Sequence, residues 1–456
     1  MGLRFDWEIE AEKTQVQRTG ESAEAKRKRR VRLLRLFIFL AIVIGFFGGI
    51  AALIVWRLDS VEQEIEQTLR STVDAEFTAL RLGDYASFAS IQRSASADWL
   101  QVQQQIFNQY QDLKMQDGVQ LSGTVSDIAV ERSRARVSVQ EIVNGIPYTR
   151  VWFYWRYEDG WRHVPPDYTF WGALEVQKVQ NVTVRYNMVD KTFAQSVAEK
   201  MSLWSRTACE ALACAVIPEI TVEVVPDEAL QTAWAAGDDW RMQIPSPYIR
   251  RARTDMPFEV DAQLAVAEKL ADRLILQASN NMQPVYPTDA YYLRQAVVSW
   301  LVGNMAQVDT GAYIVGSLAT NYGAEAVGQL VHAMAPDSNL SLLTQVTGKP
   351  VEQAGLDWRD YLTWRLELED ELLQKRDEAS YLALYDTRDE AARNLAYQRF
   401  SMNEVTGKKQ VSSVQSEIQA DGTTILRVVV IVGEGAAIQQ TEITFRLADG
   451  VWKRVN

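Results

Sequence analysis

The chain has 456 residues, of which 47% are hydrophobic and 10% aromatic, so it can form two to four domains with packed cores and is not a disordered protein. Its formal net charge of -12 argues against nucleic acid as a partner, because phosphate binding needs a basic surface. The charge is uneven: residues 1–35 carry ten Lys/Arg and six Asp/Glu, so the acidic excess lies entirely in the rest of the chain.

The first predicted element is a membrane-spanning helix at residues 36–56. These 21 residues, LFIFLAIVIGFFGGIAALIVW, carry no charge, and a helix of this length spans ~32 Å, which matches the hydrocarbon core of a bilayer. The 35 preceding residues and the length of the apolar run favour an uncleaved signal anchor over a cleaved signal peptide. Seven basic residues between Lys26 and Arg35 precede the span. The positive-inside rule therefore predicts a cytoplasmic basic tail, residues 1–35, that can contact membrane lipid, and an extracytoplasmic remainder.

Residues 57–172 are predicted to form a stalk helix followed by antiparallel strands. Helical spacing places Leu69, Val73, Phe77 and Leu80 on one face. Residues 119–143 and 146–164 then alternate apolar and polar side chains around an NG and a DG pair, which is typical of hairpins.

Residues 372–456 repeat this order of a helical segment followed by strands. The ends of the two regions, WRYEDGWRHV and FRLADGVWKRV, are similar, which favours a true internal repeat. We expect the hairpins at Asp159/Gly160 and Asp449/Gly450 to occupy equivalent positions, with Trp161 and Trp452 packed in the same direction. Because Val451 adds one residue, a bulge or a longer turn must absorb it, or Trp452 would face the opposite side.

Both regions resemble the nuclear transport factor two-like (cystatin-like) family, whose members pack an N-terminal helix into a bent antiparallel sheet to form a cone. The resemblance implies two α+β modules that flank a middle domain, and the family includes enzymes as well as binding and dimerising modules. Catalytic members usually place a His/Asp pair in the cone. The only candidate histidine here is His163, and its place on the final strand of the hairpin favours a structural role.

The middle region, residues 173–371, alternates strand and helix signals and then becomes helical, which predicts an α+β domain. Its order of segments is similar to the peptidase MA-like gluzincins, and its closing segment, down to TGKPVEQAGLDWRDYL, resembles the end of that family. In this comparison AEKLA at residues 267–271 matches the zinc motif H-E-x-x-H, and WLVGNMA at residues 300–306 matches W-L-x-E-G-x-A. The resemblance implies that the two matching helices pack together.

The residues that would bind zinc are replaced. Ala267 and Ala271 stand at the two histidine positions and Gly303 at the third ligand, while Glu268 alone remains, at the position of the general base. The chain has two histidines, His163 and the mid-helix His332, and they lie in different predicted domains, so a two-histidine zinc site is not expected. We therefore expect no metal and no other cofactor. Restoring the two histidines and a glutamate at residue 303 is expected to create zinc affinity if the backbone has kept its geometry.

Cys209 and Cys214 are the only cysteines. An even pair outside the cytoplasm suggests a disulfide, which requires the helix to end between them, and two buried free thiols are the alternative.

Together these features predict a single-pass, membrane-anchored, extracytoplasmic pseudopeptidase that works as a binding or assembly protein. Its expected partner is a protein or peptide, and the flanking modules could support oligomerisation. The alternative is a hydrolase or peptidase with a non-standard site around Glu268, or a small-ligand-binding module in a flanking cone. Elemental analysis for stoichiometric zinc distinguishes the favoured reading from a zinc peptidase.

Overall fold

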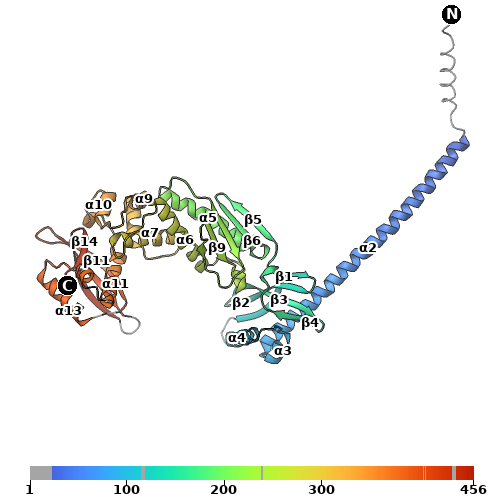
Figure 1. The fold of residues 1–456 in the computed structure, drawn as a ribbon, viewed down its shortest axis with the longest axis horizontal. Coiled ribbons are helices and arrows are strands. Elements are labelled where there is room, and N and C mark those ends of the chain that lie inside the picture. The colour runs from blue at the N-terminus through green and yellow to red at the C-terminus, as the bar shows by residue number, and fades with distance from the viewer. Residues whose placement is uncertain (1–22, 115–118, 238–239, 404, 406, 434–437) are drawn as a thin grey trace, which may run out of the picture. The chain divides into compact units, whose positions relative to one another are not determined.

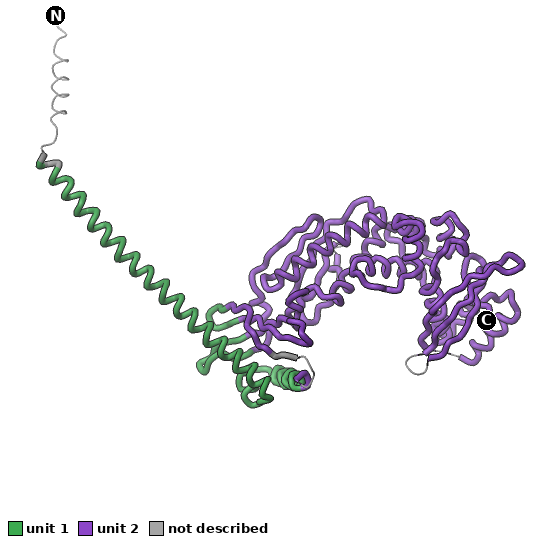
Figure 2. Tube along the Cα trace, turned by 180° about the vertical axis from the view of Figure 1, so that it is seen from behind, with its two compact units in different colours: residues 1–111, 130–135, 154–163 green, residues 112–129, 136–153, 164–456 purple. Residues whose placement is uncertain are grey.

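The computed structural model describes residues 23–114, 119–237, 240–403, 405, 407–433 and 438–456, and shows a mixed α/β protein. Most of the predicted basic tail therefore lies outside the described residues. The chain separates into two compact units (Figure 2). Unit 1 comprises residues 1–111, 130–135 and 154–163, and unit 2 comprises residues 112–129, 136–153 and 164–456.

Unit 1 is built around the end of one very long helix, α2 (Ala23–Leu82), drawn in blue in Figure 1. Its apolar part is long enough to cross a membrane and none of it is buried within the protein. The four apolar residues predicted on one face further along are all buried: Leu69, Val73, Phe77 and Leu80. The helix therefore leaves its apolar segment exposed and packs only its last turns into the folded unit.

Two shorter helices complete this part of unit 1. They are α3 (Tyr85–Ile91) and α4 (Ala97–Lys114), of which α4 enters unit 2 at its end. Gly83 adopts a positive φ of 74° and ends α2, and the Asp84 side chain then caps α3 by accepting a hydrogen bond from the Ser87 N–H. Phe107 of α4 packs against Phe88 of α3, with ring centroids 5.4 Å apart. A tight turn therefore folds α3 back so that its apolar face is covered.

The first sheet has the order β1-β2-β3-β10, with β4 also paired to β3, and its long strands run through both units. Its strands are β1 (Val119–Glu131), β2 (Arg134–Val143), β3 (Ile146–Tyr157), β4 (Gly160–Val164) and β10 (Ala252–Arg253). The predicted NG turn joins β2 to β3, where Asn144 and Gly145 both have positive φ.

The second sheet lies wholly in unit 2 and has the order β5-β6-β7-β9-β8. Its strands are β5 (Leu174–Val179), β6 (Val182–Asn187), β7 (Ile220–Val225), β8 (Ala233–Trp234) and β9 (Arg241–Pro245). Strands β6 and β7 are parallel, so the chain must cross over between them, and helix α5 (Lys191–Ala211) makes this crossover and packs on β5 and β6. The strand, helix, strand order predicted for this region is confirmed.

Helices make up the next part of unit 2, and the first and fourth of these pack on α5. They are α6 (Val260–Ala278), α7 (Asp289–Ala306), α8 (Tyr313–Tyr322), α9 (Ala324–Ala333) and α10 (Ser341–Thr347). A Cβ at Gly328 of α9 would lie 2.5 Å from the carbonyl oxygen of Ala211, so only glycine lets α9 approach the end of α5. Single 3-10 turns occur at Tyr168–Phe170, Met188–Asp190, Pro247–Ile249 and Val351–Gln353.

The C-terminal region is a four-stranded antiparallel sheet in the order β11-β12-β13-β14, preceded by helices. The helices are α11 (Arg359–Lys375), α12 (Glu378–Leu382) and α13 (Glu390–Met402); the strands are β11 (Lys409–Ile418), β12 (Thr424–Val432), β13 (Gln439–Ala448) and β14 (Val451–Arg454). The predicted boundary at residue 371 falls inside α11, which packs on both α8 and β11.

The closing hairpins differ from the prediction in one respect. The turn before β4 is Glu158–Asp159, whereas the turn before β14 is Asp449–Gly450, so the two DG pairs are not equivalent. Shifting the turn by one residue absorbs the additional Val451. Trp161 and Trp452 therefore both occupy the second position of their strands, and both are buried, at 1% and 0% exposure.

Candidate ligand-binding pocket

A pocket in the described residues of unit 2 lies where α7 ends and α8 begins. It has a volume of about 480 Å³. Its wall combines two aromatic side chains with amides and carboxylates, and it is formed by Trp300, Gly303, Asn304, Gln307, Val308, Asp309, Thr310, Ala312, Tyr313, Gly316, Ser317 and Asp357. A mixed wall of this kind suits a ligand that has both an apolar surface and polar groups.

The end of α7 shapes one side of this pocket. Gln307 adopts a left-handed conformation that stops the helix, and the N–H of Val308 then donates to the Gly303 carbonyl at 3.1 Å. A Cβ at Gly303 would lie 3.0 Å from both the Val308 carbonyl oxygen and the Thr310 hydroxyl oxygen. Glycine at this position therefore lets the chain fold tightly over the helix end.

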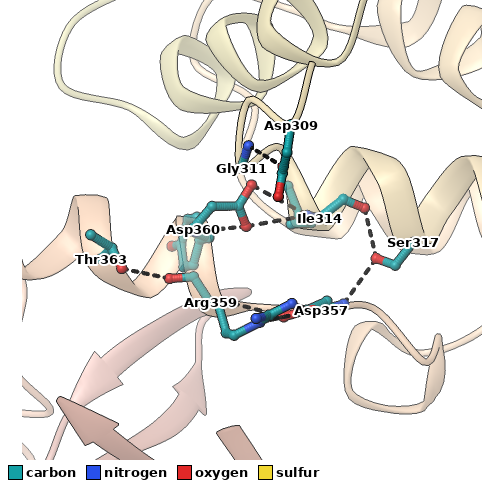
Figure 3. A network of polar contacts seen from close by, with 9 residues as sticks. Asp309, Gly311, Ile314, Ser317, Asp357, Arg359, Asp360 and Thr363 are labelled. Atoms are coloured by element: carbon teal, nitrogen blue, oxygen red, sulfur yellow. Dashed lines mark hydrogen bonds and ion pairs between the residues drawn. The ribbon is translucent and has the colours of Figure 1, made fainter. Parts of the chain in front are cut away.

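Asp360 caps the start of α8, although it lies 46 residues further along the chain (Figure 3). Both of its carboxylate oxygens accept from the Ile314 N–H, at 3.2 and 3.3 Å, although Asp360 lies in the first turn of α11. Two helix N-termini therefore meet at one carboxylate, and their positive ends favour its charged form. Burial acts in the opposite direction and is the larger effect. It raises the pKa of Asp360 to about 6, while the neighbouring Tyr292 hydroxyl and the Ile314 N–H oppose the rise.

A second carboxylate in these polar contacts, Asp357, lines the pocket and binds the side chain of Arg359. The Arg359 guanidinium donates to both oxygens of Asp357 at 2.7–3.0 Å and stacks on the Tyr313 ring, 3.8 Å from its centroid. The Ser317 hydroxyl accepts from the Asp357 N–H at 2.9 Å, and this bond connects the segment before α11 to α8 (Figure 3). This side of the pocket thus already accommodates a guanidinium between a carboxylate and an aromatic face.

Asp309 is the exposed carboxylate of the pocket. It accepts from the Gly311 N–H at 2.9 Å and so stabilises the loop between α7 and α8. A second pocket of about 390 Å³ shares Asp357 with the first and extends between residues 352–359 and the edge strand β11. Asp357 therefore contributes to the walls of both pockets.

Helices α6 and α7, which carry the zinc-motif matches, pack against each other as predicted, and Arg294 joins them through an ion pair with Asp272 at 2.7 Å. Ala267 and Ala271 are both fully buried. Glu268 instead points to solvent, with 62% of its side chain exposed and Lys269 at 3.6 Å. The structure therefore does not bring these residues together around a cavity.

Gly303, the third of the replaced ligand positions, directs its missing side chain at the 308–310 turn. It lines the pocket, but a glutamate there would collide with this turn unless the turn moved. Among the described residues, no group of three or more His, Cys, Asp or Glu side chains is placed to hold a metal ion.

Each cysteine and each histidine has a partner that the structure describes. Helix α5 ends at Ala211, and Cys209 and Cys214 form a disulfide across this end, with Cα atoms 4.9 Å apart. His332 contacts the Leu212 carbonyl at 2.9 Å, and His163 contacts the buried Glu76 carboxylate at 2.7 Å. None of these four side chains lines either pocket.

Comparisons with known proteins add no relative: no family model, curated protein or solved structure matches the chain. The pocket must therefore be interpreted from its own residues. Sequence reasoning examined WLVGNMA only as a degenerate zinc motif, and the carboxylates Asp309, Asp357 and Asp360 were missed. The segments VDTG and LDWRD, each with an aspartate beside a helix start, were the available signals.

Proposed function

We propose that this chain is a single-pass membrane-anchored protein that lies mainly outside the cytoplasm and binds a polypeptide partner at the pocket between α7 and α8. The partner contributes a basic side chain to this pocket. The observation that carries the proposal is the wall itself, where an aromatic ring and a carboxylate already hold a guanidinium. Assembly on a membrane surface, rather than hydrolysis, is then the work of the protein, and the flanking modules could add contacts between copies.

The anchor supports the membrane location. The apolar part of α2 has no packing partner in the described residues, whereas the same helix becomes buried from Leu69 onward. An apolar helix surface without a protein partner is stable in a bilayer. Because basic residues precede the apolar segment and acidic residues follow it, the positive-inside rule favours a cytoplasmic N-terminus.

The composition of the pocket supports a basic partner. Asp309 is exposed and its described hydrogen bond is only to the backbone of its own loop. Trp300 and Tyr313 provide aromatic surface beside it, and Asn304 is exposed on the same helix end. Carboxylates next to aromatic rings attract guanidinium and ammonium groups through both charge and the ring quadrupole.

The positions of the zinc-motif matches give the hydrolase alternative less support. A general base has to contact the proton that it removes inside a substrate site, whereas Glu268 is exposed beside a lysine. The buried alanines at residues 267 and 271 leave no opening next to it.

Orientation is tested first with two reporters fused to the C-terminus of the full chain in bacterial cells. Alkaline phosphatase is active outside the cytoplasm, whereas green fluorescent protein exported through the general secretory route is dark. We expect phosphatase activity and no fluorescence. The reverse pattern would place the folded units in the cytoplasm and refute the proposed location.

The pocket is tested by placing a photo-crosslinking amino acid at residue 304 of the full chain in its native cells. The same amino acid at Gln195, an exposed position on α5, is the matched control. We expect a cross-linked product of discrete mass from residue 304 alone, and a weaker product when Asp309→Asn removes the pocket charge. Identical products from both positions, or no change with Asp309→Asn, would refute a charge-dependent binding pocket.

A further inference from the structure

The short strand β10 brings two arginines together on unit 2. Its register pairs Ala252 with Thr149 and Arg253 with Tyr148. One step further along this antiparallel register, Arg251 comes opposite Arg150. Since side chains of cross-strand partners point to the same face, the Arg150 and Arg251 side chains leave the sheet from neighbouring positions on one face. The Arg251 guanidinium lies 4.9 Å from the Tyr148 ring centroid, which confirms that Arg251 is on the face of β3 that carries Tyr148 and Arg150.

This pair of positive charges has no matching carboxylate among the residues that the structure describes. Arg253, on the same face, is neutralised by Asp255, with bonds of 3.0 and 2.7 Å. Among the described residues, Arg150 and Arg251 form no such ion pair, and the buried Glu141 of the neighbouring strand β2 has an interaction of its own. Arg251 is exposed and Arg150 is half-buried, so a ligand can reach both.

The second sheet of unit 2 shows how this chain balances arginines on a sheet elsewhere. There Glu223 lies between Arg185 and Arg241, with N–O distances of 3.6 Å to each. Like charges that face each other across strands are destabilising, and the glutamate removes this cost. Arg150 lies on β3 and Arg251 directly precedes the neighbouring strand β10, and no residue in the described part of the chain supplies a carboxylate to them.

We propose that Arg150 and Arg251 form a binding site for a phosphoryl group. The bound group would neutralise these two arginines as Glu223 neutralises Arg185 and Arg241 in the second sheet. Two guanidinium forks can donate several hydrogen bonds to the oxygens of one phosphate, and the two positive charges match a phosphate better than a single carboxylate. Tyr148 orients the Arg251 fork by stacking against it. This site is separate from the pocket at α7 and does not depend on the function proposed for that pocket.

The phosphoryl group could belong to a phospholipid headgroup or to a free phosphate compound, and the test separates the two. The full chain is purified in a neutral detergent and titrated calorimetrically with inorganic phosphate at constant ionic strength. We expect saturable binding that becomes about tenfold weaker in Arg150→Gln and in Arg251→Gln, because each change removes a charged donor. Dihexanoylphosphatidylglycerol is then added as a competitor. Displacement of phosphate assigns the site to lipid headgroups, and lack of displacement assigns it to free phosphate.

Controls show whether the effect is specific to this site. Arg185→Gln and Arg427→Gln remove sheet arginines that have carboxylate partners, and both should leave phosphate binding unchanged. Arg251→Lys keeps the charge but loses the planar fork, so binding should be weakened less than in Arg251→Gln. Circular dichroism checks that each variant is folded. Absence of saturable phosphate binding, or an equal loss in the control variants, would overturn the proposal.

Discussion

The N-terminal module, residues 57–164, and the C-terminal module, which begins with α11 and comprises residues 359–456, each bury a glutamate at the same place, but they surround it with different charges. Glu76 lies eight residues before Asp84, which caps α3, and Glu369 lies eight residues before Asp377, which caps α12. Both carboxylates are almost completely buried, at 0% and 1% exposure. A buried carboxylate is costly unless it is paired, so the surrounding donors decide what each glutamate contributes.

In the N-terminal module the donors to Glu76 are neutral side chains and a histidine. The amide of Gln92 and the ring of His163 both contact one carboxylate oxygen at 2.7 Å, and the Tyr154 hydroxyl donates to the other at 2.8 Å. Tyr154 also stacks on His163, with ring centroids 5.1 Å apart. Burial beside Glu76 raises the pKa of the Tyr154 hydroxyl well above its ordinary value, which keeps it a donor.

In the C-terminal module the same carboxylate position is held by two permanent cations. Arg454 and Arg399 donate to one oxygen of Glu369 at 2.7 and 3.1 Å, and the Tyr385 hydroxyl lies 3.4 Å from it. All three residues are buried. The charge on Glu369 is therefore required to offset buried arginines, whereas Glu76 mainly satisfies hydrogen-bond donors.

The backbone around the two sites is equivalent, which argues for a true repeat. An isolated parallel bridge joins Gln92 to His163 of β4, and another joins Tyr385 to Arg454 of β14. In each module the next residue along the chain donates its N–H to the carbonyl of the bridged strand residue: Arg93 to His163 at 2.9 Å, and Asp386 to Arg454 at 3.0 Å. The two modules therefore share this backbone framework and differ at the strand position that holds His163 in one and Arg454 in the other.

The helices that carry these glutamates differ in what precedes them. In the N-terminal module α2 continues backwards into the apolar segment, and in the C-terminal module α11 begins beside the pocket, where Asp360 caps α8. The same helix position thus connects one module to the apolar segment and the other to the candidate binding site.

The largest expected effect comes from Glu369→Gln. This change leaves two buried arginines without their counter-charge, and breaking a buried ion pair in this way costs about 3–5 kcal/mol of the free energy of unfolding. Denaturant unfolding of the full chain, with amide hydrogen exchange to localise the loss to residues 378–456, measures it. Glu417→Gln, in an exposed pair with Arg427, is the control and should have little effect. A loss no larger than that of the control would refute the distinction between the modules.

The second expected effect is a pH dependence that belongs to the C-terminal side alone. Asp360 lies nine residues before Glu369. The equivalent position in the N-terminal module, nine residues before Glu76, is the exposed Gln67, which does not titrate. Because the pKa of Asp360 is raised by burial to about 6, the folded state binds its proton more tightly than the unfolded state. Its contribution to stability is therefore fully present below about pH 4, the ordinary aspartate range, and is lost as the pH rises through 6.

Asp360→Asn removes this titration while keeping a polar side chain near the start of α8. We expect the difference in unfolding free energy between the two proteins to change by on the order of 2–3 kcal/mol between pH 4 and 7. Asp190, whose burial also raises its pKa to about 6, is present in both proteins and cancels in the difference. A difference that stays constant with pH would contradict the assignment to Asp360.

Sequence patterns predicted the parts of this comparison that depend on local physics. Helical spacing identified the buried face of α2, because Val73, Phe77 and Leu80 recur at the helical period. Glu76 falls on that same face, three residues after Val73. A charged residue on an apolar helix face indicates a buried carboxylate with a partner, so this site could have been predicted from the sequence. The NG and DG pairs likewise located hairpin turns, within one residue.

Contacts between distant segments could not be predicted in the same way. The pocket needs Trp300 and Tyr313 beside Asp357, and Asp360 caps a helix 46 residues earlier in the chain. Such contacts depend on how helices pack, which the spacing of apolar residues in one segment does not specify. For the same reason the match of WLVGNMA to a zinc motif did not reveal that Gly303 is required by the turn that follows it.

A smaller loss is expected from Glu76→Gln. The amide can still accept from Tyr154, and its NH₂ group can donate to Gln92 if that amide rotates to present its own buried oxygen, so one buried contact, that with His163, is lost, about 1–2 kcal/mol. Neither lysine nor arginine contacts Glu76 in these hydrogen bonds, so the change leaves no permanent charge unpaired. The measurement is the same unfolding assay, with hydrogen exchange followed in residues 60–111. If Glu76→Gln cost as much as Glu369→Gln, the two buried carboxylates would have the same role.

The smallest effects should be equal in the two modules, because they depend on the framework that the repeat shares. Asp84 accepts from the Ser87 N–H and Asp377 from the Ser380 N–H, both at 3.1 Å, and hydrogen bonds from these serines lower the pKa of both aspartates. Each cap is therefore effective above the ordinary aspartate pKa and is lost as the pH falls below it. Asp84→Ala and Asp377→Ala should speed amide exchange in α3 and α12 by similar factors at neutral pH, whereas the Asn variants should retain most of the protection, because asparagine also caps helices. If only one helix responded, the two caps would be similar in geometry alone, and the buried glutamates would remain the stronger argument for a shared origin.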